Sequence, residues 1–269
     1  NDKPLSNTFV RRVHAVLQAA LKQAVKERLI PYNPCENCRI PPKDKKEMTI
    51  LPPEKIGRYL QEAEKYGVLP MFYLELSSGL RRGELLALQW TDLNVKERIL
   101  TVNKQVTRME GELDVTEPKT KNSVRKVALS QQAVDLLVQE HEQHPDNPIL
   151  FPSPRTGGYW SPDAVSRINR KLLKNAGIEE HMRFHDLRHT FATMAISSGV
   201  DVKTLSSMLG HYSAGFTLDT YTHITNDMQR GAAEKIGGFM ESATATPTPE
   251  PPDLPEKSRC KVIPFEKVG

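Results

Sequence analysis

A histidine and an arginine stand three residues apart in residues 184–191, which read FHDLRHTF. On a helix this spacing places His185 and Arg188 on one face, while Leu187 and Phe191 on another face can anchor the helix in a core. An imidazole can move a proton, and a planar guanidinium matches two oxygens of a phosphate. A lone helical histidine is more often an ordinary surface residue, so the pair needs support from elsewhere in the chain.

A second arginine and three further residues support this interpretation. Residues 77–88 read SSGLRRGELLAL, so a turn at Gly79 delivers Arg81 to the start of a predicted helix. The N-terminal end of a helix dipole disfavours cations, so basic side chains there indicate an anion, although solvated arginines are the simpler alternative for this segment alone. Together the chemically useful residues are the set that transfers a phosphodiester without metal or nucleotide cofactor: Arg81, Lys119, His185, Arg188, His211 and Tyr221.

The order of these residues resembles the tyrosine recombinase family, and the resemblance runs from residue 5 to residue 240. In that family the first arginine follows a Gly-Leu pair and precedes an acidic residue, which favours Arg81 over Arg82. The other matches are Lys119 in a Lys-Thr context between predicted strands, His185 and Arg188 as His-x-x-Arg, His211 as Leu-Gly-His, and Tyr221 as the nucleophile.

The resemblance implies a tyrosine recombinase catalytic domain, mainly α with a small three-stranded antiparallel sheet, preceded by part of a helical core-binding domain. It implies site-specific DNA recombination, by which a mobile element is integrated or excised through a 3′-phosphotyrosyl intermediate. The expected partners are double-stranded DNA recombination sites and further copies of the chain, from a dimer to a tetramer on DNA. We expect no cofactor and no metal.

Elementary chemistry assigns roles to the phosphate-binding residues. A phosphodiester gains negative charge on its non-bridging oxygens as a nucleophile attacks in line, and guanidinium groups meet those oxygens with paired hydrogen bonds. Arg81 and Arg188 are therefore expected to hold the phosphate. His211 can donate a third hydrogen bond.

The proton transfers involve the remaining residues. Tyrosine loses its proton only near pH 10 in water, so attack by Tyr221 needs a nearby acceptor, which His185 can provide. The departing 5′ oxygen needs a proton, and Lys119 is the first candidate donor. Lys121 and His189 are second candidates for these two roles.

Basic residues are concentrated near the beginning of the sequence. The net charge is +4, and residues 1–50 hold ten Lys and Arg against five Asp and Glu. A localised basic region can neutralise DNA phosphates, although a solvated basic face is the alternative. The predicted DNA contacts are Arg11, Arg12, Lys43, Lys45, Lys46, Lys121 and Arg125.

Hydrophobic periodicity predicts the elements that must position these side chains. An amphipathic helix is expected over residues 9–29, and helices at 53–65, 69–78, 81–88, 131–142, 161–176, 185–198, 201–209, 214–223 and 226–240. Three β-type runs, 99–102, 112–115 and 124–129, predict an antiparallel meander. The Pro-rich stretch before residue 53 predicts a boundary, so the expected parts are 1–42 (end of the core-binding domain), 43–52 (linker), 53–241 (catalytic domain) and 242–269 (flexible tail).

The tail and the cysteines give weaker signals. The Pro-rich tail ends in an apolar run at 260–265, which either docks on a neighbouring protomer or is a frayed terminus. Cys35 and Cys38 form a CxxC pair, but a closed zinc site needs four ligands, so structural or incidental thiols are expected. No apolar stretch is long enough to span a membrane. We therefore expect no membrane partner, and we expect a cytoplasmic location.

Two other classes of protein share part of this pattern. A DNA-binding regulator would explain residues 201–221 as a helix-turn-helix, but it would leave Arg81, Lys119 and the pair at 185 and 188 without a role. An enzyme like type IB topoisomerases would share the chemistry without recognising a defined site. A metal-dependent nuclease or phosphatase is disfavoured because no carboxylate cluster has ligand spacing.

Overall fold

The computed structural model describes residues 5–43, 48–109, 111–116, 124–178, 182–210, 215, 217–218 and 233–242. Several predicted site residues lie outside these ranges: Lys45, Lys46, Lys119, Lys121, His211 and Tyr221. The predicted tail from residue 243 onward also lies outside them. The chain divides into two units, residues 1–192 and residues 193–269, and each is described by itself.

The first helix, α1 (Asn7–Lys26), begins where the Ser6 hydroxyl accepts a hydrogen bond from the Phe9 amide at 3.2 Å. No side chain of α1 is buried, and several of its large apolar residues are exposed, among them Phe9, Val13, Val16 and Leu17. This agrees with the amphipathic helix expected here, whose apolar stripe needs a partner to cover it. The loop that follows lies along α1, because Asn33 Nδ2 donates to the Gln18 carbonyl oxygen at 3.2 Å.

The later helices are α2 (Pro53–Lys65), α3 (Leu69–Ser78), α4 (Arg82–Ala87), α5 (Gln131–Glu142), α6 (Pro162–Asn175), α7 (Phe184–Ser197) and α8 (Val202–Leu209). Their bounds agree with the predicted ones to within one residue, because the signals that limit them are local. Pro53 begins α2, and the left-handed glycines Gly79 and Gly210 end α3 and α8. In the described part of the chain, no helix is long and apolar enough to cross a membrane.

A three-stranded antiparallel sheet is present, as predicted, but one of its strands differs from the prediction. The strands lie in the order β1 (Leu93–Asn94), β2 (Ile99–Val102) and β5 (Arg125–Ala128). Leu100, in the central strand, pairs with Leu93 on one side and with Val127 on the other. All three leucine and valine side chains are buried, so this register places one face of the sheet in the core.

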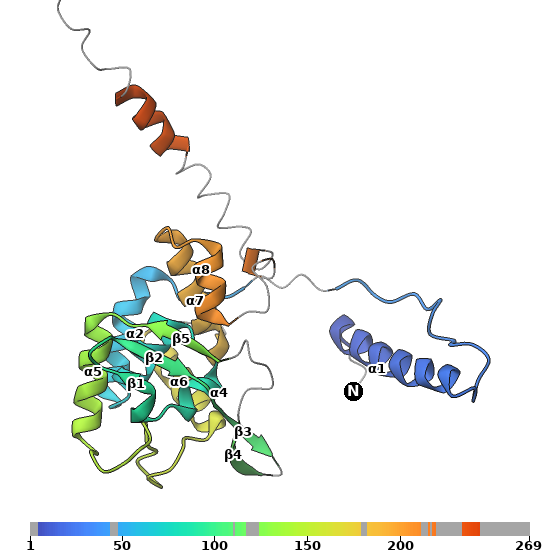
Figure 1. Cartoon of the computed structure of the whole chain (residues 1–269), viewed down its shortest axis with the longest axis horizontal. Helices are drawn as coiled ribbons and strands as arrows, with labels where there is room; N and C mark the ends of the chain where they lie inside the picture. Colours follow the sequence, from blue (N-terminus) through green and yellow to red (C-terminus); the bar gives the residue numbers. More distant parts are fainter. Residues whose placement is uncertain are drawn as a thin grey trace, which may run out of the picture. The chain divides into compact units, whose positions relative to one another are not determined.

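The predicted meander is wrong for residues 112–115, which form a separate ribbon. Strand β4 (Glu112–Thr116) pairs with β3 (Gln105–Met109), and Figure 1 shows this ribbon projecting away from the three-stranded sheet. The first four side chains of β4 are exposed, so the strand offers no face to the core. A Cβ at Gly83 would lie 2.7 Å from the Val106 carbonyl oxygen, so only glycine lets α4 approach β3 this closely.

The helices of the first unit are joined by an aromatic and polar cluster. The rings of Tyr59 and Phe72 meet edge to face at 5.9 Å, and those of Phe72 and Phe184 at 5.8 Å. The Tyr59 hydroxyl donates to Asn169 Oδ1 at 2.6 Å. These contacts connect α2, α3 and α6 to α7, the helix that carries His185 and Arg188.

Candidate active site

Arg188 lies on α7 and is buried, with 3% of its surface exposed. Its Nη1 donates to the carbonyl oxygen of Gly79 at 2.7 Å. Gly79 ends α3 in the left-handed conformation, and Arg81 follows two residues later. Burial lowers the pKa of Arg188 to about 10, and Arg81 adds to the lowering, so the side chain keeps its charge at neutral pH. The turn at the end of α3 therefore brings the two predicted phosphate-binding arginines together.

Arg81 is held in place by Glu84, one turn further along α4. The Arg81 backbone N–H donates to Glu84 Oε2 at 2.9 Å, and its Nη1 donates to Oε1 at 2.7 Å. The Arg81 side chain is 39% exposed, whereas that of Glu84 is 4% exposed. The buried Glu84 carboxylate thus fixes the Arg81 guanidinium, whose exposed part can still bind an anion from solvent.

Arg125 also binds the carboxylate of Glu84. Its Nη1 and Nη2 donate to the two carboxylate oxygens at 3.1 and 2.7 Å, and its side chain is only 5% exposed. Burial alone would raise the pKa of Glu84, but the hydrogen bonds from Arg125 and Arg81 outweigh it and lower the pKa. We predicted a DNA contact at Arg125; the structure instead places its guanidinium in the interior, where it positions Glu84.

A second buried acid, Glu75, lies on α3. It is fully buried, and among the described residues no donor reaches either carboxylate oxygen. Burial raises the pKa of Glu75 well above its ordinary value. The positive charges of Arg188 and Arg125 lower this pKa, and the negative charge of Glu84 raises it further. Burial therefore favours the protonated, neutral form of Glu75. The three guanidiniums of Arg81, Arg125 and Arg188 outnumber the carboxylates of Glu75 and Glu84, so the cluster has a net positive charge for an anion to meet.

His185 is the second residue of α7, the helix that carries Arg188, and it is exposed. Desolvation lowers its pKa to about 4, with further lowering by His189 and Arg188. Because part of the side chain meets solvent, water screens these effects, but their direction keeps the imidazole neutral and able to accept a proton. The ring of His189 lies 5.0 Å from it, edge to face. Asp186 fixes the helix start, accepting hydrogen bonds from the Arg183 backbone N–H at 2.7 Å and its Nη2 at 2.9 Å.

Other predicted DNA contacts are only partly covered by the described residues. Arg12 and Lys43 are exposed, and Arg11 Nη1 donates to the Pro41 carbonyl oxygen at 2.8 Å. Of the predicted catalytic residues, the described part of the chain contains Arg81, His185 and Arg188. The roles of the other predicted residues remain predictions.

Sequence reasoning missed the roles of two residues in this site. Residues two apart in a strand share a face, so the buried Val127 indicates that Arg125 also points inward. Glu75 is an acid inside the otherwise uncharged helix LPMFYLELSS, and an acid there needs either a partner or a proton. Both patterns could be seen in the sequence. They indicate that Arg125 and Glu75 are buried, but they do not indicate which groups these residues contact.

Comparison with known proteins decides the family. The model for the phage integrase family matches residues 50–228. The chain belongs to the phage integrase family. The integrase of ICEBs1 from Bacillus subtilis strain 168 is 31% identical over 249 residues, which cover 88% of this chain and 67% of that protein. A XerC-like tyrosine recombinase of Caldanaerobacter subterraneus is 28% identical over 263 residues, 87% of this chain and 67% of the relative.

The fold of this integrase agrees with solved structures of similar proteins. The Tn1549 transposon integrase in complex with a circular intermediate DNA matches with a TM-score of 0.75 at 22% identity, over 87% of this chain and 81% of that one. The XerA recombinase matches with a TM-score of 0.58 at 24% identity, over 86% and 85%. The expected family and fold class are confirmed. The integrase is a tyrosine-type DNA recombinase, which breaks and rejoins DNA strands at specific sites.

Proposed function

We propose that this integrase inserts and excises a mobile element, with Tyr221 as the nucleophile and Arg81 and Arg188 on the scissile phosphate. The observation that carries the proposal is the arginine cluster around Glu84. Arg188 donates to the Gly79 carbonyl oxygen in the turn that precedes Arg81, and the cluster has a net positive charge. The relatives named after a conjugative element and a transposon support a mobile element as the substrate.

The arginine cluster is suited to a phosphate that becomes more negative during reaction. In the transition state the attacking and leaving oxygens lie in line, and the extra charge gathers on the non-bridging oxygens. Arg81 is exposed enough to contact them directly, while Arg188 is buried and already oriented. Because both are fixed before DNA binds, the site spends little free energy on reorganisation when the charge develops. His211 adds a further hydrogen bond in this proposal.

Proton transfer completes the reaction. Tyr221 Oη attacks phosphorus as its proton passes to the neutral imidazole of His185, and the bond from phosphorus to the 5′ oxygen breaks. Lys119 gives a proton to that oxygen, which leaves a 3′-phosphotyrosyl link and a free 5′ hydroxyl. The new ester retains the free energy of the old one, so a second DNA end can reverse the step without ATP.

The partner is double-stranded DNA carrying recombination sites. Exposed Arg12 and Lys43 can meet backbone phosphates, and we include Lys45, Lys46 and Lys121 in the same role. Strand exchange joins several cleaved ends, so we propose that two to four copies of the chain assemble on DNA. The tail from residue 242 is the segment that we propose to dock on a neighbouring copy.

The test is covalent capture of the protein on nicked suicide duplexes taken from the ends of its own element. We expect a protein–DNA adduct on a denaturing gel that disappears in Tyr221→Phe while gel-shift binding persists. Tyr66→Phe is the matched control, because Tyr66 is 44% exposed at the end of α2 and should leave the adduct unchanged. An adduct that survives Tyr221→Phe would show that another residue is the nucleophile.

A further inference from the structure

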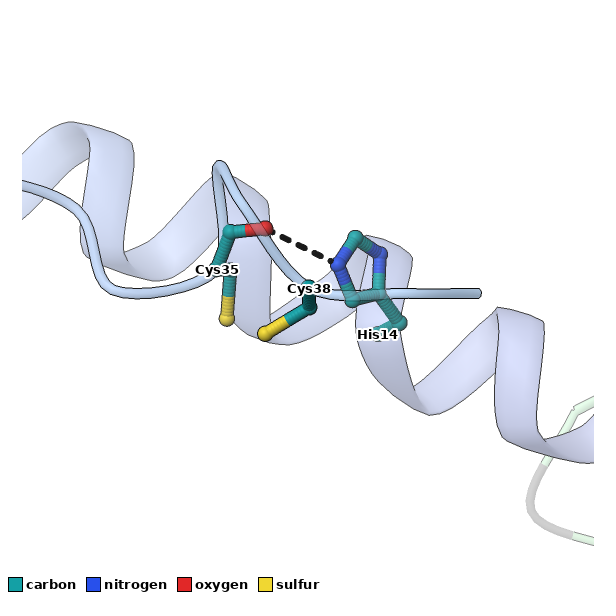
Figure 2. Close-up of side chains that lie close together, drawn as sticks. All are labelled: His14, Cys35 and Cys38. Carbon is teal, nitrogen blue, oxygen red and sulfur yellow. Dashed lines mark hydrogen bonds between the residues drawn. The ribbon is translucent and has the colours of Figure 1, made fainter. Parts of the chain in front are cut away.

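A histidine lies beside the two cysteines of the CxxC pair. Figure 2 shows His14, on α1, next to Cys35 and Cys38 in the loop that follows the helix. One possible ligand atom from each of the three residues lies within 4.8 Å of the others. Cys35 is buried, His14 is half-buried and Cys38 is exposed. The cluster is therefore partly enclosed, with one side open to solvent.

Hydrogen bonds hold this loop in shape and against the helix. The Cys35 backbone N–H donates to Asn33 Oδ1 at 3.0 Å, and Asn33 Nδ2 donates to the Gln18 carbonyl oxygen at 3.2 Å. His14 Nε2 lies 3.2 Å from the Cys35 carbonyl oxygen. Gln18 stands one helical turn after His14, so the loop contacts one face of α1 at two successive turns. The three side chains are thus brought together by the fold of the chain itself.

We propose that His14, Cys35 and Cys38 bind one zinc ion. Two thiolates and an imidazole are the donors that zinc prefers, and two cysteine thiolates neutralise its charge. With Zn–S near 2.3 Å and Zn–N near 2.0 Å, tetrahedral donors lie roughly 3.5 to 3.8 Å apart. Small rotations of the side chains bring ligand atoms now within 4.8 Å to that separation. The fourth position is left for a water molecule or another ligand.

The metal would brace a part of the chain that has little else to stabilise it. No residue of α1 is buried, and hydrogen bonds such as Arg11 to Pro41 hold the following loop to the helix. Zinc would add a link between α1 and the loop that does not depend on covering apolar surface. The loop leads to Lys43, so the link also limits how far the predicted DNA-binding residues can move from the helix.

The position of His14 favours a metal over a redox disulfide. A bond between Cys35 and Cys38 would close a loop of four residues and would need no histidine. It would also add no link to α1, whereas His14 on α1 lies against the Cys35 carbonyl oxygen and Asn33 holds the Cys35 backbone N–H. A disulfide is therefore the alternative outcome of the test.

The experiment is a cobalt titration of the reduced, metal-free 269-residue chain, followed by zinc competition. Cobalt bound by thiolates in a tetrahedral site gives sulfur charge-transfer and intense visible bands, which should saturate at one equivalent and be abolished by zinc. Cys38→Ser and His14→Gln should each weaken zinc binding by more than about a hundredfold, because outer-shell changes alone cost tenfold to a hundredfold. Cys38 is exposed, so its replacement should leave the helix content unchanged by circular dichroism.

Cys260→Ser is the matched control, because it removes the third cysteine and should retain full binding. Absence of the cobalt bands would overturn the proposal, as would equal binding by wild type and His14→Gln. Loss of binding in Cys260→Ser would overturn the three-residue site in favour of one that includes the tail. A non-reduced chain lacking two hydrogens by mass, combined with no metal binding after reduction, would establish the disulfide instead.

Discussion

Replacing Glu75 by glutamine tests whether this buried acid is neutral in the folded protein. In the unfolded chain the carboxyl has an ordinary pKa near 4.5, whereas burial raises its pKa well above that value in the folded state. Between the two pKa values the folded state binds one more proton than the unfolded state. The free energy of unfolding therefore falls as pH rises through this window, by about 1.4 kcal/mol per pH unit.

The assay is urea unfolding of both proteins between about pH 5.5 and about pH 6.5, a range in which unfolded glutamate is already ionised. The Glu75→Gln variant lacks this titration, so its stability relative to wild type should rise by about 1.4 kcal/mol across that unit. Other titrating groups are present in both proteins and cancel in the difference. Of the groups that face Glu75, Arg188 keeps its charge in this range and Glu84, whose pKa is lowered, stays ionised; Arg125, the third, is present in both proteins.

Parallel pH profiles would refute the reasoning, because they would mean that Glu75 has lost its proton before the window begins. In that case the carboxylate would be an ion-pair partner of Arg188. Its replacement would then lower stability at every pH, by about 3 to 5 kcal/mol, because a buried charge would lose its partner. The sign of the slope difference thus distinguishes a neutral acid from a buried salt bridge.

Three further substitutions test the site and its support. Arg125→Met should lower the free energy of unfolding by about 3 to 5 kcal/mol, because Glu84 loses its buried partner, and Arg125→Lys should recover only part of it in urea unfolding. Tyr59→Phe should cost about 1 to 2 kcal/mol in the same measurement, since it removes the hydrogen bond to Asn169 without changing the shape of the core. His185→Gln should slow covalent adduct formation by about a hundredfold or more in single-turnover assays. Because the pKa of His185 is lowered to about 4, the wild-type rate should show no loss from protonation of this residue between about pH 6 and about pH 8.

The helices could be predicted because residues at or next to their ends determine where they begin and end. Pro53 at the start of α2 and Gly79 at the end of α3 each act on the backbone next to them, and the structure places both where the sequence indicated. The sheet could not be predicted to the same degree, since its central strand β2 pairs with β5, which lies much further along the chain, and the strands between them form a separate ribbon. Glu112 and its neighbours have a strand-like composition, and only their exposure shows that they pair outside the core sheet.

The candidate site divides in the same way between local and distant information. His185 and Arg188 could be recognised because they share one short helical segment. The pairing of Arg125 with Glu84 and the approach of His14 to Cys35 join residues 41 and 21 positions apart, and nothing in either segment alone specifies the contact. These contacts depend on the completed fold, which is why the sequence suggested a surface arginine and an incidental pair of thiols.

The hydrogen bond between Arg188 and the Gly79 carbonyl has a consequence for the protein during its synthesis. A nascent chain that has passed the ribosome only as far as α6 contains Arg81 but not the residue that secures the turn before it. Such a chain, like any product of premature termination, carries only one arginine of the pair. The turn before Arg81 is therefore secured only after α7 has been translated, so Arg81 reaches its final position late in the synthesis of the chain.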